Sequence, residues 1–300
     1  MTVPEELTLL ESTMAADDLQ NIRGFLFPKA SLFAKNNIED TLDYVPHDDD
    51  IIIASYPKTG TTLLQYIVIQ IVSKGEMYPD MDDCLFKHIP YLEATGTSVL
   101  DKMEKPRIYK HHCPYNMVQK NDKAKCLYTY RRPEDTAISY YHFLSILEST
   151  PKGLNGYFEN FLSGNIGYGN YFDHVLSFYA HKCDENMLLV SYEKLQLNKR
   201  DEILRIAKFL GEEYYQSLIE DEQLLEKILE RTSFDYMKKN LSLTHPKSGK
   251  GAERKTVNFF RKGVIGDGKK SLSSEQQERL KNMAVKKLKE SELFDEWMKE

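Results

Sequence analysis

A cluster of hydroxyl, lysine and glycine residues directly follows a short β-branched run. The stretch 55–62 reads SYPKTGTT and comes after three isoleucines at 51–53. Glycine lets a backbone approach a ligand closely, threonines supply hydroxyl donors and Lys58 supplies positive charge, so this turn suits a phosphate. Lys58 precedes Gly60, whereas the lysine of a Walker A loop follows its second glycine. An ordinary turn between a strand and a helix is the alternative.

Two adjacent histidines form a second candidate site. His111 and His112 stand in the sequence KHHCP at 110–114, just after the expected strand 107–109. A histidine can act as a general base near neutral pH. In an extended segment neighbouring side chains point to opposite faces, so at most one of the two lines a given crevice, and no third ligand completes a metal site. A structural hydrogen bond is the alternative role for either histidine.

Arginine and serine side chains offer a third candidate site, for a second anion. Arg131 and Arg132 end an apolar run, and Ser139 follows Arg131 by about two helical turns. An arginine at the carboxyl end of a strand and a hydroxyl from the next helix can face one phosphate. A surface ion pair with Glu134 or Asp135 is the alternative.

Segment 238–270 departs from the average charge of the chain. Its basic residues stand against only Glu253 and Asp267, and glycines interrupt it repeatedly. We expect a mobile loop with little regular structure, and a solvated basic surface is the alternative. The basic residues are Lys238, Lys239, Lys247, Lys250, Arg254, Lys255, Arg261, Lys262, Lys269 and Lys270.

Alternating strands and helices must position these segments. Repeated βα units predict a parallel sheet with right-handed crossovers, and the candidate segments would meet at its carboxyl edge. Beyond Gly211 strand signals fade, and the last helix is expected to start near Ser273 with Gln276 completing a capping box. The fold class is therefore α/β, with a central, mostly parallel sheet flanked by helices in a single domain over 1–300. Strands are expected at 51–55, 107–109, 126–130 and 187–190, and helices at 61–73 and 201–210.

Composition limits the class of protein. The 300 residues are 41% hydrophobic and 29% charged, which allows a large core and excludes a disordered or fibrous chain. The net charge of −6 argues against a nucleic-acid partner. The acidic start does not match a signal peptide, and the apolar stretch 63–72 is too short to cross a bilayer. Dispersed cysteines indicate free thiols, so we expect a cytoplasmic protein with no membrane partner. The cysteines are Cys84, Cys113, Cys126 and Cys183.

Taken together, the motifs resemble the cytosolic sulfotransferase family. SYPKTGTT at 55–62, RRPED at 131–135 leading into SYYHF at 139–143, and RKGVIGD at 261–267 match that family in order and spacing over nearly the whole chain. Such enzymes transfer a sulfuryl group from 3′-phosphoadenosine 5′-phosphosulfate (PAPS) to a hydroxyl or amine of a small acceptor, and release 3′-phosphoadenosine 5′-phosphate (PAP). The resemblance implies the P-loop-like sulfotransferase fold.

The resemblance also implies roles by position in this sequence. Leu63 and Gly268 stand where the family usually carries tryptophan, so an aromatic face expected against the adenine is lost at Leu63. The family's contacts to the 5′-phosphosulfate correspond to Lys58, Thr59, Gly60, Thr61 and Thr62. Its contacts to the 3′-phosphate correspond to Arg131, Ser139, Arg261, Lys262 and Gly263. Its contacts to the adenine correspond to Tyr192, Thr232, Phe234 and Phe259.

His112 matches the family's catalytic base, and His111 replaces a more usual threonine. A neutral imidazole can remove the proton of a phenol as its oxygen attacks sulfur. Lys58, Lys110 and Ser139 complete the implied catalytic set, in which the lysines stabilise charge on the leaving phosphate during an in-line displacement. This arrangement requires no metal, and we expect none.

Aromatic residues match the positions that line the acceptor pocket in the family, and ordinary core packing is their alternative role. Aromatic walls suit flat phenolic rings, so we hypothesise a phenol or catecholamine acceptor. Ala94 would widen the pocket, and Glu93 would approach an amine if it points inward. Segment 1–45 is expected to contribute to this pocket, and segment 238–270 to close over the donor. The acceptor positions are Phe33, Phe86, Tyr91 and Phe143, together with His112.

Two other functions stay open at this point. A P-loop nucleotide kinase could hold ATP in the turn at 55–62, and a non-catalytic nucleotide-binding protein is suggested by the changes at Leu63 and Gly268. A homodimer is also open. Family members often pair through a short C-terminal segment, but Ser273 and Ser274 stand where that segment typically has threonine and valine.

Overall fold

The computed structural model describes most of the chain. It covers residues 18–30, 32–78, 87–147, 153–240, 260 and 262–298, and the backbone alone at 243–245 and 255–257. The predictions for Cys84, Phe86, Phe259 and Arg261 lie outside the described residues, as does most of the first part of segment 1–45.

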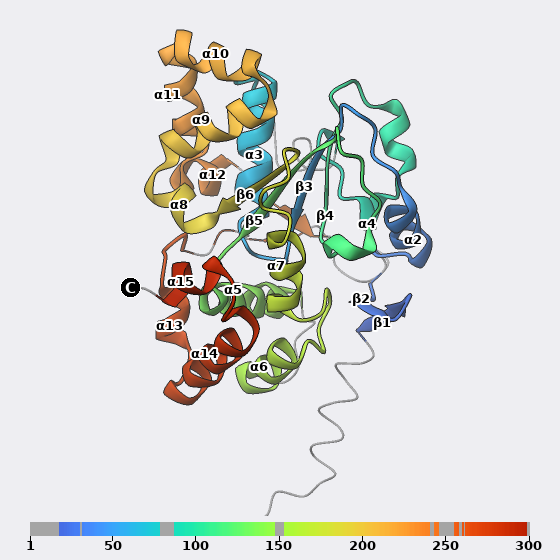
Figure 1. Cartoon of the computed structure of the whole chain (residues 1–300), viewed down its shortest axis with the longest axis vertical. Helices are drawn as coiled ribbons and strands as arrows, with labels where there is room; N and C mark the ends of the chain where they lie inside the picture. Colours follow the sequence, from blue (N-terminus) through green and yellow to red (C-terminus); the bar gives the residue numbers. More distant parts are fainter. Residues whose placement is uncertain are drawn as a thin grey trace, which may run out of the picture.

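A parallel four-stranded sheet lies at the centre of the molecule, between helices (Figure 1). Its spatial order is β4-β3-β5-β6, and all three pairings are parallel. Every residue of β3 is buried, as expected for a β-branched strand covered on both faces. The predicted strands and the α/β class are confirmed, with small shifts at the strand ends. The strands are β3 (Ile51–Ser55), β4 (Ile108–His111), β5 (Lys125–Tyr130) and β6 (Met187–Ser191).

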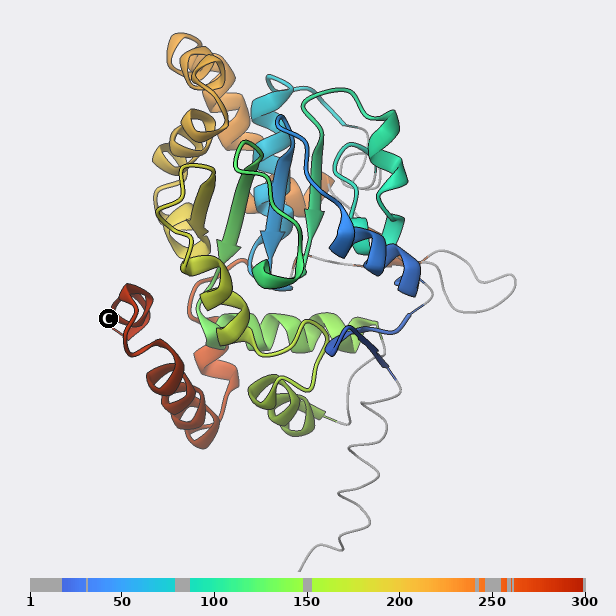
Figure 2. The same ribbon diagram turned by 45° about the vertical axis from the view of Figure 1, so that its right-hand side comes forward.

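Helices begin directly at the carboxyl ends of these strands. α3 (Thr61–Val72) follows β3, α5 (Pro133–Ile146) follows β5, and α8 (Tyr192–Leu197) follows β6. Pro133 opens α5 because proline fits the first turn of a helix, where its missing N–H is not needed. Figure 2 shows α5 passing beneath the carboxyl edge of the sheet, where the candidate segments were expected to meet.

The remaining helices surround the sheet and the segments beneath it (Figures 1 and 2). Those on the amino-terminal side and in the middle of the chain are α2 (Lys35–Asp43), α4 (Leu92–Thr95), α6 (Gly153–Ser163) and α7 (Tyr171–Tyr179). Those that follow β6 are α9 (Lys199–Leu210), α10 (Glu212–Glu220), α11 (Glu222–Arg231), α12 (Phe234–Asn240), α13 (Asp267–Ser271), α14 (Ser274–Leu288) and α15 (Glu292–Met298).

The sheet separates two hydrophobic layers. Alternate residues of the strands contribute to opposite layers: Ile51 and Ile53 belong to one, and Ile52 and Ala54 to the other. The first layer is mainly aliphatic and packs against α3, α9 and α11. The second is rich in aromatic rings, and it includes Tyr56, Tyr128, Phe161, Tyr171 and Phe172. This aromatic layer includes residues that contact His112.

Two expectations about the carboxyl-terminal part are wrong. Strands do not cease after Gly211, because β7 (Leu243–His245) and β8 (Lys255–Val257) form an antiparallel hairpin, and α13 adds a helix within segment 238–270. The capping box of Ser273 and Gln276 is confirmed at the start of α14, but that helix is followed by α15 and is not the last. Local signals predicted the starts of α3 and α14 and came within two residues of the start of α9, but they did not reveal the short hairpin.

An antiparallel hairpin of β1 (Leu19–Ile22) and β2 (Phe25–Pro28) precedes the sheet. It packs Phe27 into the aromatic layer, so the described part of segment 1–45 is anchored to the body of the fold. Within the described residues, none of the helices is long and apolar enough to cross a lipid bilayer.

Candidate active site

The turn between β3 and α3 has the backbone of an anion site. Lys58 and Gly60 both adopt left-handed conformations, with φ of 70° and 105°. Left-handed residues in such a turn gather backbone N–H groups into a concave surface at the helix N-terminus. A Cβ at Gly60 would lie 2.6 Å from Cδ2 of Tyr192, so the ring of Tyr192 closes over a position that only glycine can occupy.

The hydroxyl groups of Thr59 and Thr61 in this turn are engaged within the protein. The buried Thr59 Oγ1 lies 2.8 Å from the carbonyl oxygen of Tyr56 and 2.9 Å from that of Thr129, and the Thr129 hydroxyl donates to the carbonyl of Thr59. Thr61 Oγ1 lies 2.7 Å from Ser55 Oγ. These bonds tie the turn to β5 and β3, so the Thr59 hydroxyl is already occupied by protein groups.

Two lysines, Lys58 in the turn and Lys110 in β4, each place their ammonium group over an aromatic ring. Lys58 Nζ lies 4.5 Å from the centre of the Phe143 ring, and Lys110 Nζ lies 4.0 Å from that of Tyr91. Burial, with the positive charges of Lys110 and Arg131, lowers the pKa of Lys58 to about 7. Burial also lowers the pKa of Lys110. The positive charges of Lys58, Lys110 and Arg131 repel one another. A polyanion would offset this repulsion, so it suits this cluster.

His112 lies beside the same turn in a defined tautomer. Its Nδ1 is 2.7 Å from the carbonyl oxygen of Ser55, and a carbonyl oxygen can only accept, so Nδ1–H is the donor. Burial, with the charge of Lys110, lowers the pKa of His112 and keeps the ring neutral. The lone pair is therefore on Nε2, which is the state a general base needs. The ring is held edge-on by Tyr91 and Tyr168, at centroid distances of 5.2 and 5.4 Å.

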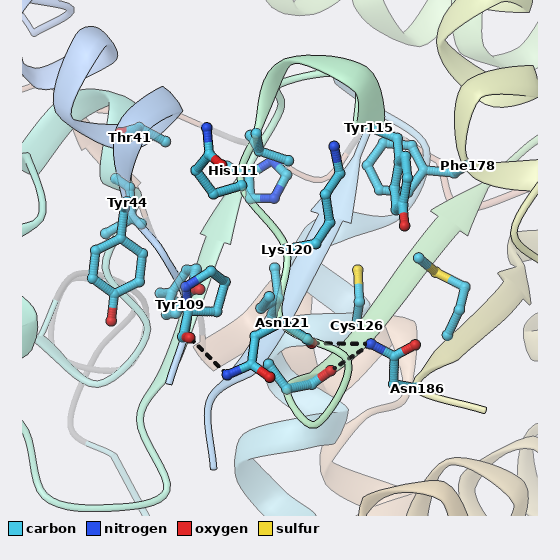
Figure 3. Close-up of a pocket in the computed structure, with 17 residues that line it drawn as sticks. Thr41, Tyr44, Tyr109, His111, Tyr115, Lys120, Asn121, Cys126, Phe178 and Asn186 are labelled. Carbon is cyan, nitrogen blue, oxygen red and sulfur yellow. Dashed lines mark hydrogen bonds between the residues drawn. The ribbon is translucent and has the colours of Figure 1, made fainter. Parts of the chain in front are cut away.

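His111 points to the opposite face of the sheet, as the strand geometry predicted. It lines a cavity of about 40 Å³ together with Tyr109, Cys126 and Phe178 (Figure 3). Among the described residues, Nδ1 of His111 and the hydroxyl of Tyr109 have no hydrogen-bond partner, although both are buried. A cavity of this size, with polar groups in its lining, has room for ordered water.

Acid stability tests the setting of His111. Burial lowers its pKa to about 3 from the ordinary 6.5. Between these values the unfolded chain binds the proton and the folded chain does not, so stability is lost as the pH falls below about 6.5. Both proteins should lose unfolding free energy between pH 7.5 and 4.5. We expect the loss to be smaller in His111→Thr than in the wild type, by up to about 2 kcal/mol.

Urea unfolding at several pH values measures this difference. Thr41 lines the same cavity, and Thr41→Ser, which removes no ionisable group, serves as the control whose pH dependence should match that of the wild type. An unaltered pH dependence of unfolding in His111→Thr would contradict the prediction.

Arg131 forms the second cationic point of the site. Its guanidinium carbon lies 4.3 Å from the centre of the Tyr192 ring, and Nη2 lies 3.4 Å from Asp135 Oδ2. Its buried Nε has no hydrogen-bond partner among the described residues. The Asp135 carboxylate also accepts the N–H groups of Gly266 at 2.8 Å and Gly268 at 2.6 Å, so it ties the loop before α13 to the start of α5.

The loop before α13 carries Lys262 and Gly263, and it packs against the ring of Phe234. Gly263 has φ of 65°, and a Cβ there would lie 2.4 Å from Cδ2 of Phe234. Phe234 in turn meets Phe260 edge to face at 6.2 Å. Lys262 pairs with Asp267 at 2.9 Å. Thr232 is fully buried and donates its hydroxyl to the carbonyl of Ile228, so it completes the end of α11.

The described aromatic candidates for the acceptor pocket lie close to His112 or Lys58. Phe33 meets Tyr91 edge to face at 5.5 Å, Tyr91 meets His112, and Phe143 lies under Lys58. Phe33 follows β2, so the described part of segment 1–45 does reach these residues. Ser139 is half-buried on α5, between Arg131 and Phe143 along the chain.

Glu93 does not face an incoming amine. It is 0% exposed, and its Oε1 accepts the backbone N–H of His112 at 2.6 Å. Burial raises the pKa of this carboxyl group. The idea that Glu93 recognises an amine is therefore not supported, and its contact is with the backbone of the proposed base.

Sequence reasoning missed several residues of this site. Tyr168 and Glu93 contact His112, and Asp135 holds the loop before α13, yet none of them stands in a pattern that announces this role. The described cysteines are free thiols, as predicted. Within the described part of the chain, no three His, Cys, Asp or Glu side chains cluster as metal ligands would.

Comparisons with known proteins define the family. A family model described as the sulfotransferase domain matches residues 48–292. Mouse sulfotransferase 1B1 is 34% identical over 285 residues, which cover 90% of this chain and 92% of that relative. Mouse sulfotransferase 1E1 is 32% identical and aligns with 80% of this chain and 84% of its own length.

A solved structure agrees with these matches. Mouse sulfotransferase SULT7A1, whose crystal structure contains PAP, superposes with a TM-score of 0.75 and 26% identity, over 93% of this chain and 98% of that one. The chain belongs to the sulfotransferase family and has its fold, and the protein is a sulfotransferase. The expected family, fold and enzyme class are confirmed, and the nucleotide-kinase alternative is set aside.

Proposed function

We propose that this protein transfers a sulfuryl group from PAPS to the hydroxyl of a small phenolic or catecholamine-like acceptor, with His112 as the general base. The observation that carries the proposal is the tautomer of His112. Its Nδ1–H is held by the carbonyl of Ser55, at the end of β3, which leaves the lone pair on Nε2. The presence of PAP in the related mouse structure supports PAPS as the donor.

PAPS carries a 5′-phosphosulfate and a 3′-phosphate, and the site offers a cationic group for each, at Lys58 and at Arg131. The left-handed turn with Lys58 and Gly60 would hold the 5′-phosphosulfate through backbone N–H groups, including those of Thr59, Thr61 and Thr62. Arg131, with its unpartnered Nε, would meet the 3′-phosphate together with Ser139, Lys262 and Gly263. Tyr192, Phe234 and the buried Thr232 would border the adenine, where Phe260 adds a ring that the sequence did not indicate. Arg261 and Phe259 stay as predictions from the family resemblance.

The reaction then needs one proton transfer and one displacement. His112 Nε2 takes the proton of the acceptor hydroxyl while that oxygen forms a bond to sulfur. The bond between sulfur and the bridging phosphate oxygen breaks, and PAP leaves with the electron pair. Lys58 and Lys110 stabilise the charge that grows on the bridging and sulfuryl oxygens. The proton on His112 returns to solvent after the sulfated product departs.

The choice of acceptor rests on the aromatic surroundings of His112. Phe33, Tyr91 and Phe143 offer ring faces and edges to a flat substrate. Glu93 is buried and its Oε1 accepts the backbone N–H of His112, so the choice of a phenolic acceptor rests on the aromatic rings and not on Glu93. Location in the cytoplasm stays a prediction, as does a homodimer.

A transfer assay with isotopically labelled PAPS tests the proposal. We expect label on a simple phenol and on dopamine, and none transferred from ATP with Mg²⁺. Equal or better turnover of a hydroxysteroid than of every phenol would contradict the acceptor class. PAP binding by calorimetry without turnover across a wide acceptor panel would instead favour a non-catalytic nucleotide-binding protein.

Gly268 provides a prediction about the loop that carries Lys262 and Gly263. A Cβ at Gly268 would lie 2.3 Å from backbone C and O atoms of Glu134 in α5. The glycine thus permits α13 to touch α5, and the side chain that the family usually has here would not fit in this arrangement. We expect Gly268→Ala to cost roughly 1–3 kcal/mol of stability and to weaken PAP binding.

Urea unfolding and calorimetric titration with PAP check the effect of Gly268→Ala. Lys270 is exposed on the same helix, so Lys270→Ala is the matched control. Wild-type stability and wild-type PAP affinity in Gly268→Ala would show that the contact between α13 and α5 does not support the donor site.

A further inference from the structure

A second histidine contacts the backbone of His112, and we propose that His174 is a positioning residue for the general base. His174 lies in α7 and is 2% exposed. Its Nε2 lies 2.9 Å from the carbonyl oxygen of His112, and its Nδ1 lies 2.9 Å from the hydroxyl of Tyr128. This inference rests on the proposed role of His112 and adds a residue to it.

The direction of both hydrogen bonds follows from elementary chemistry. A carbonyl oxygen has no proton to give, so the Nε2–H of His174 donates to His112. Burial lowers the pKa of His174 to about 4, so the ring is neutral near pH 7 and its Nδ1 accepts the proton of Tyr128. The chain of bonds from Tyr128 through His174 to the His112 carbonyl therefore has one consistent set of donors.

The backbone N–H and carbonyl groups of His112 need side-chain partners because they lie beyond the hydrogen-bonded pairing of β4 with β3. β4 ends at His111, whose partner in β3 is Ala54, and His112 is the next residue. Its N–H donates to Glu93 Oε1 and its carbonyl accepts from His174, so side chains take the place of strand partners. With the bond from Nδ1 to the Ser55 carbonyl, three contacts fix where Nε2 of His112 lies.

His174 also packs against the segment that leads into the donor turn. Its ring meets Tyr56 edge to face at 5.4 Å and stacks with Phe178 at 5.7 Å. Tyr56 lies two residues before Lys58, so one buried side chain contacts both the strand end that carries the base and the start of the turn that carries the lysine. α7 runs past the carboxyl ends of the strands, where it can make both contacts (Figure 2).

These contacts define an indirect role. Both ring nitrogens of His174 are occupied by protein groups, and the side chain is buried away from solvent, so it does not meet the acceptor itself. What it controls is the distance between His112 Nε2 and the reacting oxygen. A displacement of about 1 Å at such a point can cost roughly 10²-fold in rate.

Two substitutions at His174 separate hydrogen bonding from packing. His174→Phe keeps an aromatic ring and removes the donor, and we expect kcat to fall roughly 10-fold to 10²-fold. His174→Gln keeps an N–H near the position of Nε2, and we expect it to retain kcat within about threefold of the wild type. In both variants we expect the acceptor KM and the calorimetric Kd for PAP to stay within about twofold, because neither ligand touches His174.

Tyr128→Phe is the matched variant one step further away. It removes the proton given to Nδ1 of His174, and we expect a smaller loss of kcat, roughly twofold to fivefold, with KM unchanged. A residue that served only the core would change stability without this division between kcat and KM.

Each outcome of the experiment bears on the proposal. Wild-type kcat in a folded His174→Phe, or an equal loss in His174→Gln and His174→Phe, would overturn it. If His174→Phe does not fold, the comparison passes to His174→Gln and His174→Asn, because the shorter amide does not reach the His112 carbonyl and should lose kcat. His112→Ala is measured beside them: an active His112→Ala would refute the proposed base itself, whereas an inactive one with a fully active His174→Phe would refute only this inference.

Discussion

Replacing His112 with alanine should lower kcat for a phenol by roughly 10²-fold or more while PAP binding is retained. The substitution removes the only lone pair that the Ser55 carbonyl leaves available on this ring, which is that of Nε2. The donor contacts that we propose for the turn between β3 and α3 involve other residues, so they should stay in place. Steady-state rates with a simple phenol, together with calorimetric titration by PAP, measure both effects.

The control for this substitution is a histidine outside the site. His181 is half-buried, pairs with Asp184 and stacks on Tyr115, so His181→Ala should keep the rate of the wild type. If His112→Ala keeps its rate on a phenol, another group must remove the proton, and the assignment of the base is wrong.

Substitution of Lys58 should damage both donor binding and turnover. We expect Lys58→Met to lower kcat/KM for the donor by roughly 10²-fold to 10³-fold, because the ammonium contacts the group whose charge grows in the transition state. Lys58→Arg restores the charge with a different shape, and it should recover donor binding better than turnover. Initial rates at varied PAPS concentration separate the two effects.

The pKa of Lys58 adds a signature that packing alone would not give. Burial, with Lys110 and Arg131, lowers it to about 7, so Lys58 is mostly neutral at pH 8 in the free protein. An anionic ligand favours the protonated form, so PAP binding at pH 8 should take up a proton, and PAP affinity should fall as the pH rises above 7.

Calorimetry in buffers with different ionisation enthalpies measures this proton uptake. We expect uptake at pH 8 in the wild type and a clear reduction in Lys58→Met. Identical uptake and identical affinity in the two proteins would contradict the role assigned to Lys58.

Local patterns were sufficient to predict the elements that build the site. The β-branched run at 51–55 and the Ser273 capping box each act within a few residues, and each stands where the sequence indicated. Alternation along β4 also separated His111 from His112, since neighbours in an extended chain face opposite ways.

Long-range contacts could not be predicted in the same way. His174 meets His112 across 62 residues of sequence, and Gly268 meets Asp135 across 133. Such contacts depend on how helices pack around the sheet, and no local spacing encodes them. The role of Thr59 shows the same limit, because its hydroxyl suggested a phosphate contact whereas the fold uses it to join the turn to β5.

A crystal structure of the protein with PAP and a phenol would show directly whether the turn between β3 and α3 binds the donor and whether His112 meets the acceptor. We expect the 5′-phosphate against the backbone N–H groups of 58–62, the 3′-phosphate beside Arg131, and the phenol oxygen within hydrogen-bonding distance of His112 Nε2. A nucleotide bound elsewhere, with the turn between β3 and α3 empty, would contradict it.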